Sequence, residues 1–352
     1  MPILGILGAM SAKAFIKSIL LNPILITKTS SLSNWTTGLS VGGSNTFSNR
    51  AVFLGGTPSN FFENSNAVTT YDTSLVRNTS LTMNFGRFLV NSDVIGNFLF
   101  IAGGYWDFNG QVNCEYFNTS FVKSNATSLG LQSYGHVGGK VTNYLAYFGL
   151  GHNGQNNSTI VDYYSASNLT KGSTTLTRAS RGGGTVSFSN NIMYHYAGDS
   201  TDIDVYDGNM TKTSTPTSAF AINAMTQGEN TDSYNIAFIT RTSDLLVKTY
   251  AYTSSLTRIE LADKQDPTTS GEVAAWKNKV IASGGRISDG TTVGTVTVYD
   301  NNLVKSNATP LTQVRSDHFS AGVGNYFIIA SGSSSGGGYG TKTNSVEVYT
   351  DV

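Results

Sequence analysis

Two short patterns in the chain have the residue types and spacing of known catalytic or cofactor-binding turns. Gly38-Leu39-Ser40-Val41-Gly42 matches G-x-S-x-G, in which a serine nucleophile stands on a sharp strand-to-helix turn beside histidine and aspartate partners. Gly149-Leu150-Gly151-His152-Asn153-Gly154 matches the dinucleotide-binding pattern G-x-G-x-x-G. The first lies where the first strand of an antiparallel sheet is expected, and the second leads into a polar loop instead of a phosphate-binding helix. We therefore expect neither a catalytic nucleophile nor a nucleotide cofactor.

The histidines are the next candidates for proton transfer or metal binding. They fall in four different copies of a repeat that runs through the chain: His136, His152, His195 and His318. His136 and His318 occupy similar places in their copies, where Arg87 and Arg181 also fall. A position that recurs in this way favours a structural role, such as hydrogen bonds between repeats, over catalysis.

The acidic residues show no complete site. Asp199, Asp202 and Asp204 offer oxygen atoms to calcium, but their spacing matches no standard loop, and turn formation explains these aspartates about as well. No paired-carboxylate signature of a glycosidase occurs, although carboxylates from different repeats can meet in the folded chain. We expect no metal and no other cofactor.

Aromatic residues outside the repeat are the strongest candidates for binding a ligand. They lie in loops that follow glycine-rich strands, next to asparagine and aspartate. Flat rings beside amide and carboxylate groups suit sugars, whereas the alternatives are that the rings cap the repeats or contact a neighbouring subunit. The candidate ligand-binding residues are Phe61, Phe62, Tyr105, Trp106, Phe108, Asn109 and Tyr339.

Composition limits the classes of protein to consider. The 352 residues include 38 glycines, only 12% are charged, and the net charge is zero. Many glycines and few charges favour short strands with tight turns, and the absence of a basic excess gives a nucleic-acid partner no electrostatic support. The single cysteine, Cys114, excludes an internal disulfide, and no apolar run is long enough for a membrane span. We expect no insertion into a membrane.

The elements that position these residues come from a repeated cassette. Each copy begins with an aromatic residue that ends one strand, followed by a polar turn. Three residues then begin the next strand, namely a large apolar residue, a Val or Thr, and a basic residue. Successive aromatic residues stand 42 to 50 positions apart, which fits one four-stranded propeller blade per copy. The seven aromatic positions are Tyr71, Phe117, Tyr164, Tyr206, Tyr252, Tyr299 and Tyr349.

A second landmark precedes most cassettes, namely an apolar strand that ends in glycine, as in Phe100-Ile101-Ala102-Gly103-Gly104. The fifth copy departs, with Ala237-Phe238-Ile239-Thr240 in this place. A glycine-ended strand followed by an aromatic residue, in units of about 46 residues, resembles the kelch repeat. The resemblance extends from about Ile24 to Val352 and implies an all-β, seven-bladed kelch-like β-propeller. Kelch units usually carry a tryptophan after the aromatic residue, where this chain has Leu, Phe or Met.

The ends of the chain indicate how the ring closes. The last cassette stops after Val348 and Tyr349 and lacks an outer strand. Ile26, Thr27 and Lys28 repeat the apolar, Thr and basic residues that begin that strand in other copies. An N-terminal strand therefore completes the last blade, which leaves no free sheet edge. We divide the chain into an N-terminal segment, residues 1–22, and a propeller, residues 23–352.

The N-terminal segment is not needed by any blade. Residues 11–21 have the pattern of a short helix, which either packs on the propeller's own surface or attaches the protein to a partner. The opening residues 1–9 are similar to the short Pro/Leu/Gly/Ile/Ala leader of many bacteriophage tail and appendage proteins. The candidate attachment residues are Ile3, Leu4, Ile6, Leu7, Phe15, Ile16, Ile19 and Leu20.

Together these patterns predict a non-enzymatic structural or binding propeller. The leader implies a bacteriophage virion protein of the tail, baseplate, neck or decoration, assembled in the host cytoplasm. Its expected partners are other virion proteins, bound through the N-terminal segment, and a host glycan or receptor, with several copies in a symmetric assembly. The alternatives are a kelch-like carbohydrate-active enzyme with residues from several blades in the central channel, and a cellular protein-interaction propeller.

Overall fold

The regular structure of the described residues consists of β-strands. The computed structural model describes residues 26–39, 42–58, 63–106, 109–134, 136–150, 157–180, 183–196, 200–214, 217–225, 229–231, 233–241, 247–263, 271–287, 289–335 and 340–352. In these ranges there is no helix, and hence none that could cross a membrane. The predicted helix at residues 11–21 and all eight candidate attachment residues lie outside the described residues.

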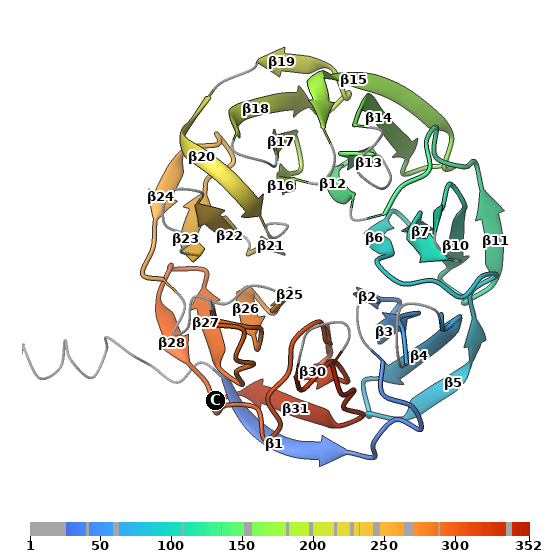
Figure 1. The fold of residues 1–352 in the computed structure, drawn as a ribbon, viewed down its shortest axis with the longest axis vertical. Helices are drawn as coiled ribbons and strands as arrows, with labels where there is room; N and C mark the ends of the chain where they lie inside the picture. The colour runs from blue at the N-terminus through green and yellow to red at the C-terminus, as the bar shows by residue number, and fades with distance from the viewer. Residues whose placement is uncertain are drawn as a thin grey trace, which may run out of the picture.

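Small antiparallel sheets stand around a central axis as the blades of a propeller, each built from strands that follow one another along the chain (Figure 1). The first blade comprises β2 (Gly43–Phe47), β3 (Arg50–Leu54), β4 (Ala67–Asp72) and β5 (Arg77–Thr82). The second comprises β6 (Asn91–Ile95), β7 (Phe98–Ala102), β10 (Cys114–Asn118) and β11 (Lys123–Ala126), with a hairpin of β8 (Tyr105–Trp106) and β9 (Asn109–Gly110). The third comprises β12 (Val137–Val141), β13 (Tyr144–Phe148), β14 (Ser158–Ser165) and β15 (Lys171–Ser180).

The remaining blades follow the same order from the axis outward. The fourth has β16 (Gly184–Phe188), β17 (Asn191–His195), β18 (Ser200–Asp207) and β19 (Lys212–Ser214), and the fifth has β21 (Glu229–Asn230), β22 (Asn235–Arg241), β23 (Val247–Tyr252) and β24 (Arg258–Glu260). The sixth has β25 (Glu272–Trp276), β26 (Lys279–Ser283), β27 (Val296–Asp300) and β28 (Lys305–Asn307). The seventh has β29 (Phe319–Val323), β30 (Tyr326–Ala330), β31 (Val346–Asp351) and β1 (Ile26–Leu32). The predicted all-β, seven-bladed propeller is confirmed.

The fourth and fifth blades are joined in a way that the repeat did not predict. An additional strand, β20 (Thr217–Met225), pairs with β18 of the fourth blade and with β22 of the fifth, so the two blades share one nine-stranded sheet. The innermost strand of the fifth blade, β21, has only two residues. This irregular region coincides with the copy whose glycine pair is missing from the sequence.

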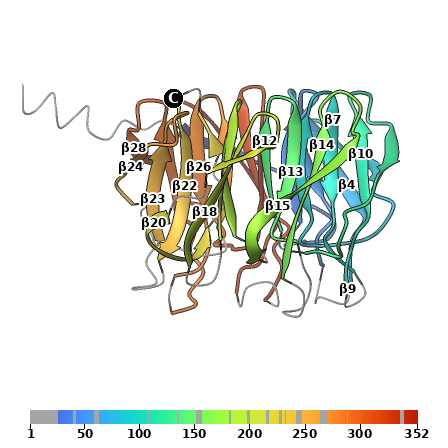
Figure 2. The same ribbon diagram turned by 90° about the horizontal axis from the view of Figure 1, so that it is seen from above.

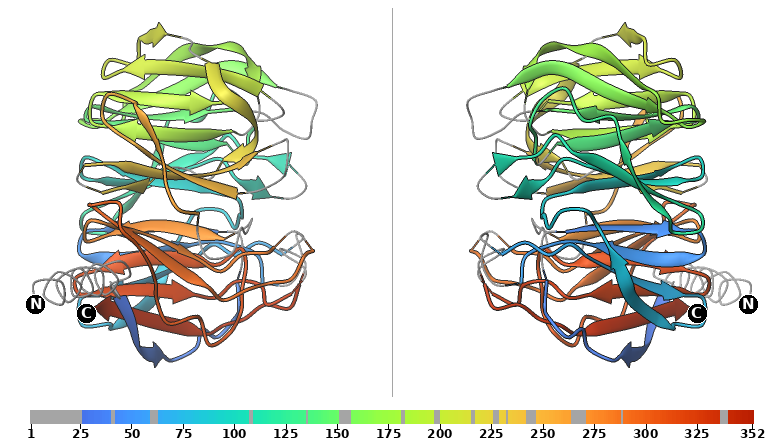
Figure 3. Two further views of the ribbon diagram at one scale, coloured as in Figure 1. Left: turned by 90° about the vertical axis from the view of Figure 1, so that its left-hand side faces the viewer. Right: turned by 90° about the vertical axis from the view of Figure 1, so that its right-hand side faces the viewer.

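The two ends of the described chain meet in the seventh blade. Strand β1 pairs antiparallel with β31, with Ile26 opposite Asp351, Thr27 opposite Thr350 and Lys28 opposite Tyr349. Figure 3 shows β1, in blue, beside the red strands of this blade. Because β1 covers the outer edge of β31, backbone groups that would otherwise face solvent are paired.

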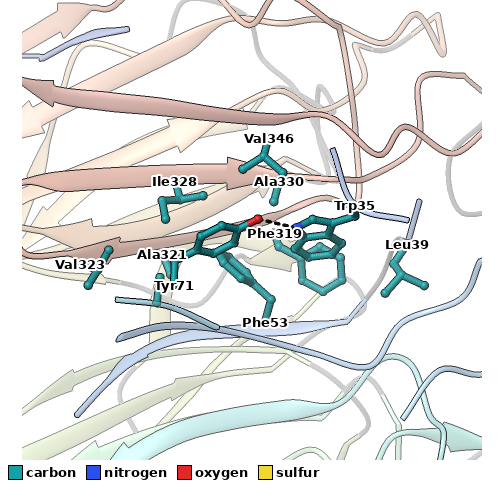
Figure 4. Packing of buried hydrophobic residues seen from close by; sticks show 11 residues of the cluster. Trp35, Leu39, Phe53, Tyr71, Phe319, Ala321, Val323, Ile328, Ala330 and Val346 are labelled. Carbon is teal, nitrogen blue, oxygen red and sulfur yellow. Dashed lines mark hydrogen bonds between the residues drawn. The ribbon is translucent and has the colours of Figure 1, made fainter. Parts of the chain in front are cut away.

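The buried hydrophobic residues that the structure describes form seven clusters, each between two neighbouring blades. In the cluster between the seventh and first blades, the Trp35 ring lies 5.6 Å from that of Phe53 and 5.5 Å from that of Phe319 (Figure 4). The Trp35 indole Nε1 donates a hydrogen bond of 3.0 Å to the Tyr71 hydroxyl. This cluster therefore joins the last blade to the first by packing as well as by strand pairing.

The cassette forms the turn between the third and fourth strands of a blade. In four of the six complete cassettes, a side-chain oxygen of the first turn residue accepts from two backbone N–H groups, as Asp300 does from Asn302 and Val304. The apolar residue of each complete cassette has a left-handed backbone, with φ between 57° and 63°, a region that side chains other than glycine rarely adopt. Its side chain packs on the blade core, which explains why glycine is not used. These residues are Leu75, Phe121, Leu169, Met210, Leu256 and Leu303.

The aromatic and basic residues of the cassette reach the preceding blade. The buried hydroxyl of Tyr299 donates a hydrogen bond of 2.7 Å to the carbonyl of Ala262, which follows the outer strand of the fifth blade. The Lys305 ammonium donates to the carbonyl of Asp263, the next residue. Tyr164, Tyr206 and Tyr349 make equivalent bonds to carbonyls of the blade before theirs. The cassette is therefore the structural unit that holds neighbouring blades together.

Candidate functional site

The order of the strands places two kinds of connection on the same face of the ring. Since consecutive strands of a blade are antiparallel, the loop after the second strand and the segment that leads from the fourth strand to the next blade lie opposite the cassette turns. Figure 2 shows β9, in one such loop, on the opposite face from the C-terminus. We call this face the loop face.

Three of the seven candidate ligand-binding residues are described. Tyr105 and Trp106 form β8, and Asn109 begins β9, so the three belong to one small hairpin after the second strand of the second blade. The others lie outside the described residues: Phe61, Phe62, Phe108 and Tyr339.

Tyr105 packs against its own molecule. Its ring lies 5.1 Å from that of Phe88 and makes an edge-to-face contact with Tyr134 at 5.0 Å. The backbone of Tyr105 also pairs with that of Phe88. Tyr105 is half-buried and packs between two segments of the loop face. This packing agrees with the alternative that these rings cap the repeats.

Trp106 lies in an exposed aromatic pair. Its ring is 6.1 Å from that of Phe85, and the two side chains are 43% and 40% exposed. Among the side chains whose burial the structure describes, no other large aromatic residue is as exposed. The backbone at Trp106 is held by Gln111, whose amide donates to the carbonyls of Trp106 and Asn109. Exposed apolar rings on a positioned backbone are typical of a contact surface.

Sequence reasoning missed Phe85 because it precedes the second blade and follows no glycine-ended strand. Two hydrogen bonds hold its neighbour Asn84. The backbone N–H donates to the Glu115 carboxylate at 2.9 Å, and the side-chain amide donates to Asn125 Oδ1 at 2.6 Å. Phe85 could have been found from the topology of the propeller. The segments that join one blade to the next lie on the same face as the loops after second strands, so aromatic residues in both kinds of segment are candidates. Asn84 precedes Phe85 in the chain and Asn109 lies opposite Trp106 in the hairpin, and both are exposed.

A second candidate site lies on the axis. A cavity of about 470 Å³ is lined by residues of the innermost strands of six blades, β2, β6, β12, β21, β25 and β29. These strands carry four ionisable side chains into its wall, Asp93, Lys140, Glu229 and Glu272. The Lys140 ammonium is 2.9 Å from Asp93 Oδ1, and Ser44 Oγ donates to Glu272 at 3.1 Å. We call this cavity the channel site.

The pKa values of the two glutamates of the channel site are raised. Burial, reinforced by the charge of Asp93 and opposed by Lys140, raises the pKa of Glu229 to about 8. Burial also raises the pKa of Glu272 to about 8, against the hydrogen bond from Ser44 and with support from the charges of Glu229 and Asp317. Sequence reasoning named none of the four ionisable residues of this site, because no blade contributes more than one of them and they are far apart in the chain.

The described histidines are buried. Burial, together with a nearby arginine in each case, lowers the pKa of His136, His195 and His318 to about 3, so all three are neutral at physiological pH. His318 Nε2 lies 2.8 Å from Ser283 Oγ. The bond of His318 joins the sixth and seventh blades as predicted, whereas the ring nitrogens of His136 and His195 are buried without a hydrogen-bond partner. His152 lies outside the described residues.

The predicted equivalence of Arg87 with His136 and His318 is wrong. The carbonyl of Arg87 accepts from Gly56 in the way that the carbonyl of Arg315 accepts from Gly285, which makes the two arginines equivalent. Each guanidinium is buried and pairs with a glutamate of a third strand, Glu115 or Glu347. His318 stands three residues later than Arg315, and the sequence pattern did not separate these two positions.

The remaining motifs of the sequence are described only in part. Asp204 is buried and accepts hydrogen bonds from Thr177 and Tyr196, whereas Asp202 forms a surface ion pair with Arg178 at 2.9 Å. Asp199 lies outside the described residues. The described residues contain no group of three His, Cys, Asp or Glu side chains that could hold a metal ion. Ser40 and residues 151–154 of the two glycine patterns lie outside the described residues, and β2 begins after the first pattern, not within it.

The chain is a β-propeller with an exposed aromatic pair on its loop face and a polar cavity on its axis. Comparison with known proteins finds no family model and no curated protein that matches the chain. The resemblance to kelch repeats therefore rests on the repeat pattern alone, and the site must be interpreted from its own chemistry.

Proposed function

We propose that the protein is a non-enzymatic binding propeller that recognises a glycan through the loop face. The observation that carries this proposal is the exposed pair of Phe85 and Trp106, with exposed Asn84 next to Phe85 in the chain and exposed Asn109 opposite Trp106 in the hairpin. A sugar ring has apolar C–H faces that pack on aromatic rings, and hydroxyl groups that exchange hydrogen bonds with amides. The fold supports a binding role, since a rigid propeller displays loops from several blades on one surface.

The setting that we propose is a bacteriophage virion, in which the N-terminal segment attaches the propeller to other virion proteins and the loop face meets the host surface. Support comes from the similarity of residues 1–9 to bacteriophage leaders. Mass spectrometry of purified virions tests this setting. Detection of the chain in stoichiometric amounts is expected, and its recovery only as a free protein of the host cytosol would refute the setting without touching the glycan proposal.

A glycan array followed by titration of each bound glycan tests the ligand. Trp106→Ala and Phe85→Ala are each expected to weaken binding by about tenfold or more, as central aromatic contacts do. Val122→Ala is the control, because Val122 belongs to the same blade and is 58% exposed, but lies in a cassette turn on the other face. Equal affinities for the wild-type protein and both aromatic variants would refute the site.

The raised pKa values of Glu229 and Glu272 favour a second candidate function, a carbohydrate-active enzyme that uses the channel site. A carboxyl group that stays protonated at neutral pH is able to act as a general acid. Incubation of every glycan that binds, followed by product analysis, separates the two functions. Turnover that is lost in Glu272→Gln would support the enzyme, and binding with no turnover would exclude it.

A further inference from the structure

The channel site has more negative than positive groups. Asp93, Glu229 and Glu272 face one cation, Lys140, and Lys140 is already paired with Asp93. Among the described residues, neither Glu229 nor Glu272 has an ion-pair partner. When all four groups are charged, the wall of the cavity therefore carries two negative charges without protein counter-ions, which favours a cationic ligand.

An independent feature of the same cavity points to a ligand. Ser320, on the innermost strand β29, lines the cavity and is only 2% exposed, yet its hydroxyl Oγ has no hydrogen-bond partner. Asn91, on the innermost strand β6 of the second blade, also belongs to the lining, and its Oδ1 atom is buried without a hydrogen-bond partner. Buried polar atoms are almost always hydrogen-bonded, so these two oxygen atoms are acceptors that a bound molecule would satisfy.

The chemistry of the lining distinguishes between types of cation. No group of three acidic or histidine side chains in the described residues converges as metal coordination requires. The wall also contains aliphatic side chains, Val273, Ala274 and Ala321, which suit methylene groups. The volume of about 470 Å³ lies within the usual range for small-molecule sites. An organic cation with separated charges on an aliphatic chain fits better than a metal ion.

We propose that the channel site binds an aliphatic diamine, whose ammonium groups take Glu229 and Glu272 as counter-ions and donate hydrogen bonds to oxygen atoms such as Ser320 Oγ. This ligand is distinct from the glycan of the loop face. Failure of one proposal leaves the other standing, because the two sites share none of the residues named for them.

Binding of a diamine is linked to the protonation of both glutamates. Glu229 faces the charges of Asp93 and Lys140, and Glu272 faces Glu229 and Asp317. Since both pKa values are raised to about 8, the ammonium groups must displace protons at neutral pH. Affinity is therefore expected to increase from about pH 6 to about pH 9, a range in which aliphatic amines with pKa values of about 10 remain charged.

Isothermal titration calorimetry with putrescine tests the proposal, with the uncharged diol of the same chain length as the ligand control. We expect saturable binding of putrescine alone, with a heat that depends on the ionisation enthalpy of the buffer because protons are released. Glu229→Gln and Glu272→Gln should each weaken binding by about tenfold or more and reduce proton release. Glu260→Gln, the same change at an exposed glutamate of the outer strand β24, should leave affinity unchanged.

Several results would overturn the proposal. Equal binding of the diol and putrescine would show that charge is not recognised. Unchanged putrescine affinity in both channel variants would place any binding elsewhere on the protein. Absence of saturable binding by the folded wild-type protein up to about pH 9, where both glutamates are ionised, would exclude the site altogether.

Discussion

Replacement of Arg315 with methionine is expected to lower the free energy of unfolding by about 3 kcal/mol, the lower end of the range for breaking a buried ion pair. Arg315 lies between the sixth and seventh blades and is fully buried. Its Nη2 is 2.6 Å from Glu347 Oε1, and its Nη1 donates to the carbonyls of Ser331 and Ser345 at 3.1 and 3.0 Å. Methionine has similar length but donates none of these bonds.

The expected loss is not larger because Glu347 keeps two other partners. Its Oε2 accepts from Lys28 and from the Thr312 N–H, both at 2.9 Å. Burial opposes ionisation of Glu347, but these two groups and Arg315 outweigh it and hold the pKa below its usual value. A lowered carboxyl pKa contributes stability above the unfolded-state pKa that is lost as pH falls through the folded-state pKa. The difference between wild type and variant should therefore shrink below about pH 4.

Guanidinium chloride unfolding, followed by circular dichroism, measures the effect. Arg178→Met is the matched control, because Arg178 pairs with Asp202 on the surface and its loss should cost less than about 1 kcal/mol. A double-mutant cycle with Glu347→Gln should give less than the sum of the single effects, since both changes break one ion pair. Equal destabilisation by Arg315→Met and Arg178→Met, or additive effects in the cycle, would refute this reasoning.

The repeated elements allow further tests by thermal or denaturant unfolding. Leu303 has φ of 61°, so Leu303→Gly should be more stable than Leu303→Ala by about 1 kcal/mol, the reverse of the usual order, and an alanine variant of equal or greater stability would contradict the left-handed turn. Tyr299→Phe removes the bond to the Ala262 carbonyl and should cost about 1 to 2 kcal/mol, whereas no change would show that this bond does not hold the fifth and sixth blades together. Deletion of residues 1–28 removes the start of β1 and should strongly lower the melting temperature, but deletion of 1–21 should leave it nearly unchanged, and a large loss in the shorter deletion would count against the assignment of β1 as the closing strand.

The blades were predictable because each depends on contacts that are close in sequence. A cassette such as that of Tyr299 combines a polar turn with two pairing strands, and local turn chemistry needs no knowledge of the rest of the fold. Its regular recurrence then gave the number of blades. What the cassette does was not predictable, because the bond from Tyr299 to Ala262 joins residues of different blades, and only the ring geometry brings them together.

The candidate sites were predictable only in part. Trp106 could be identified from its loop, but its partner Phe85 precedes the second blade and becomes a neighbour through the shared face of the ring. The arginine and histidine positions were confused because a three-residue offset between copies is small beside the variation in copy length. The closing strand was predictable, because Ile26, Thr27 and Lys28, which were recognised in the sequence as its start, all pair with β31.

The sequence by itself determined the repeated strands, their turns and the number of blades, since these follow from a local pattern that recurs along the chain, although the additional strand β20 does not. The tertiary structure alone decided the channel site, where Asp93 and Glu272 belong to blades that are far apart in sequence but face one axis. Neither residue stands in a recognisable motif, and the raised pKa of Glu272 arises from burial and from charges on other strands. Such an environment exists only after the ring has closed, which is why no pattern of residue types could reveal it.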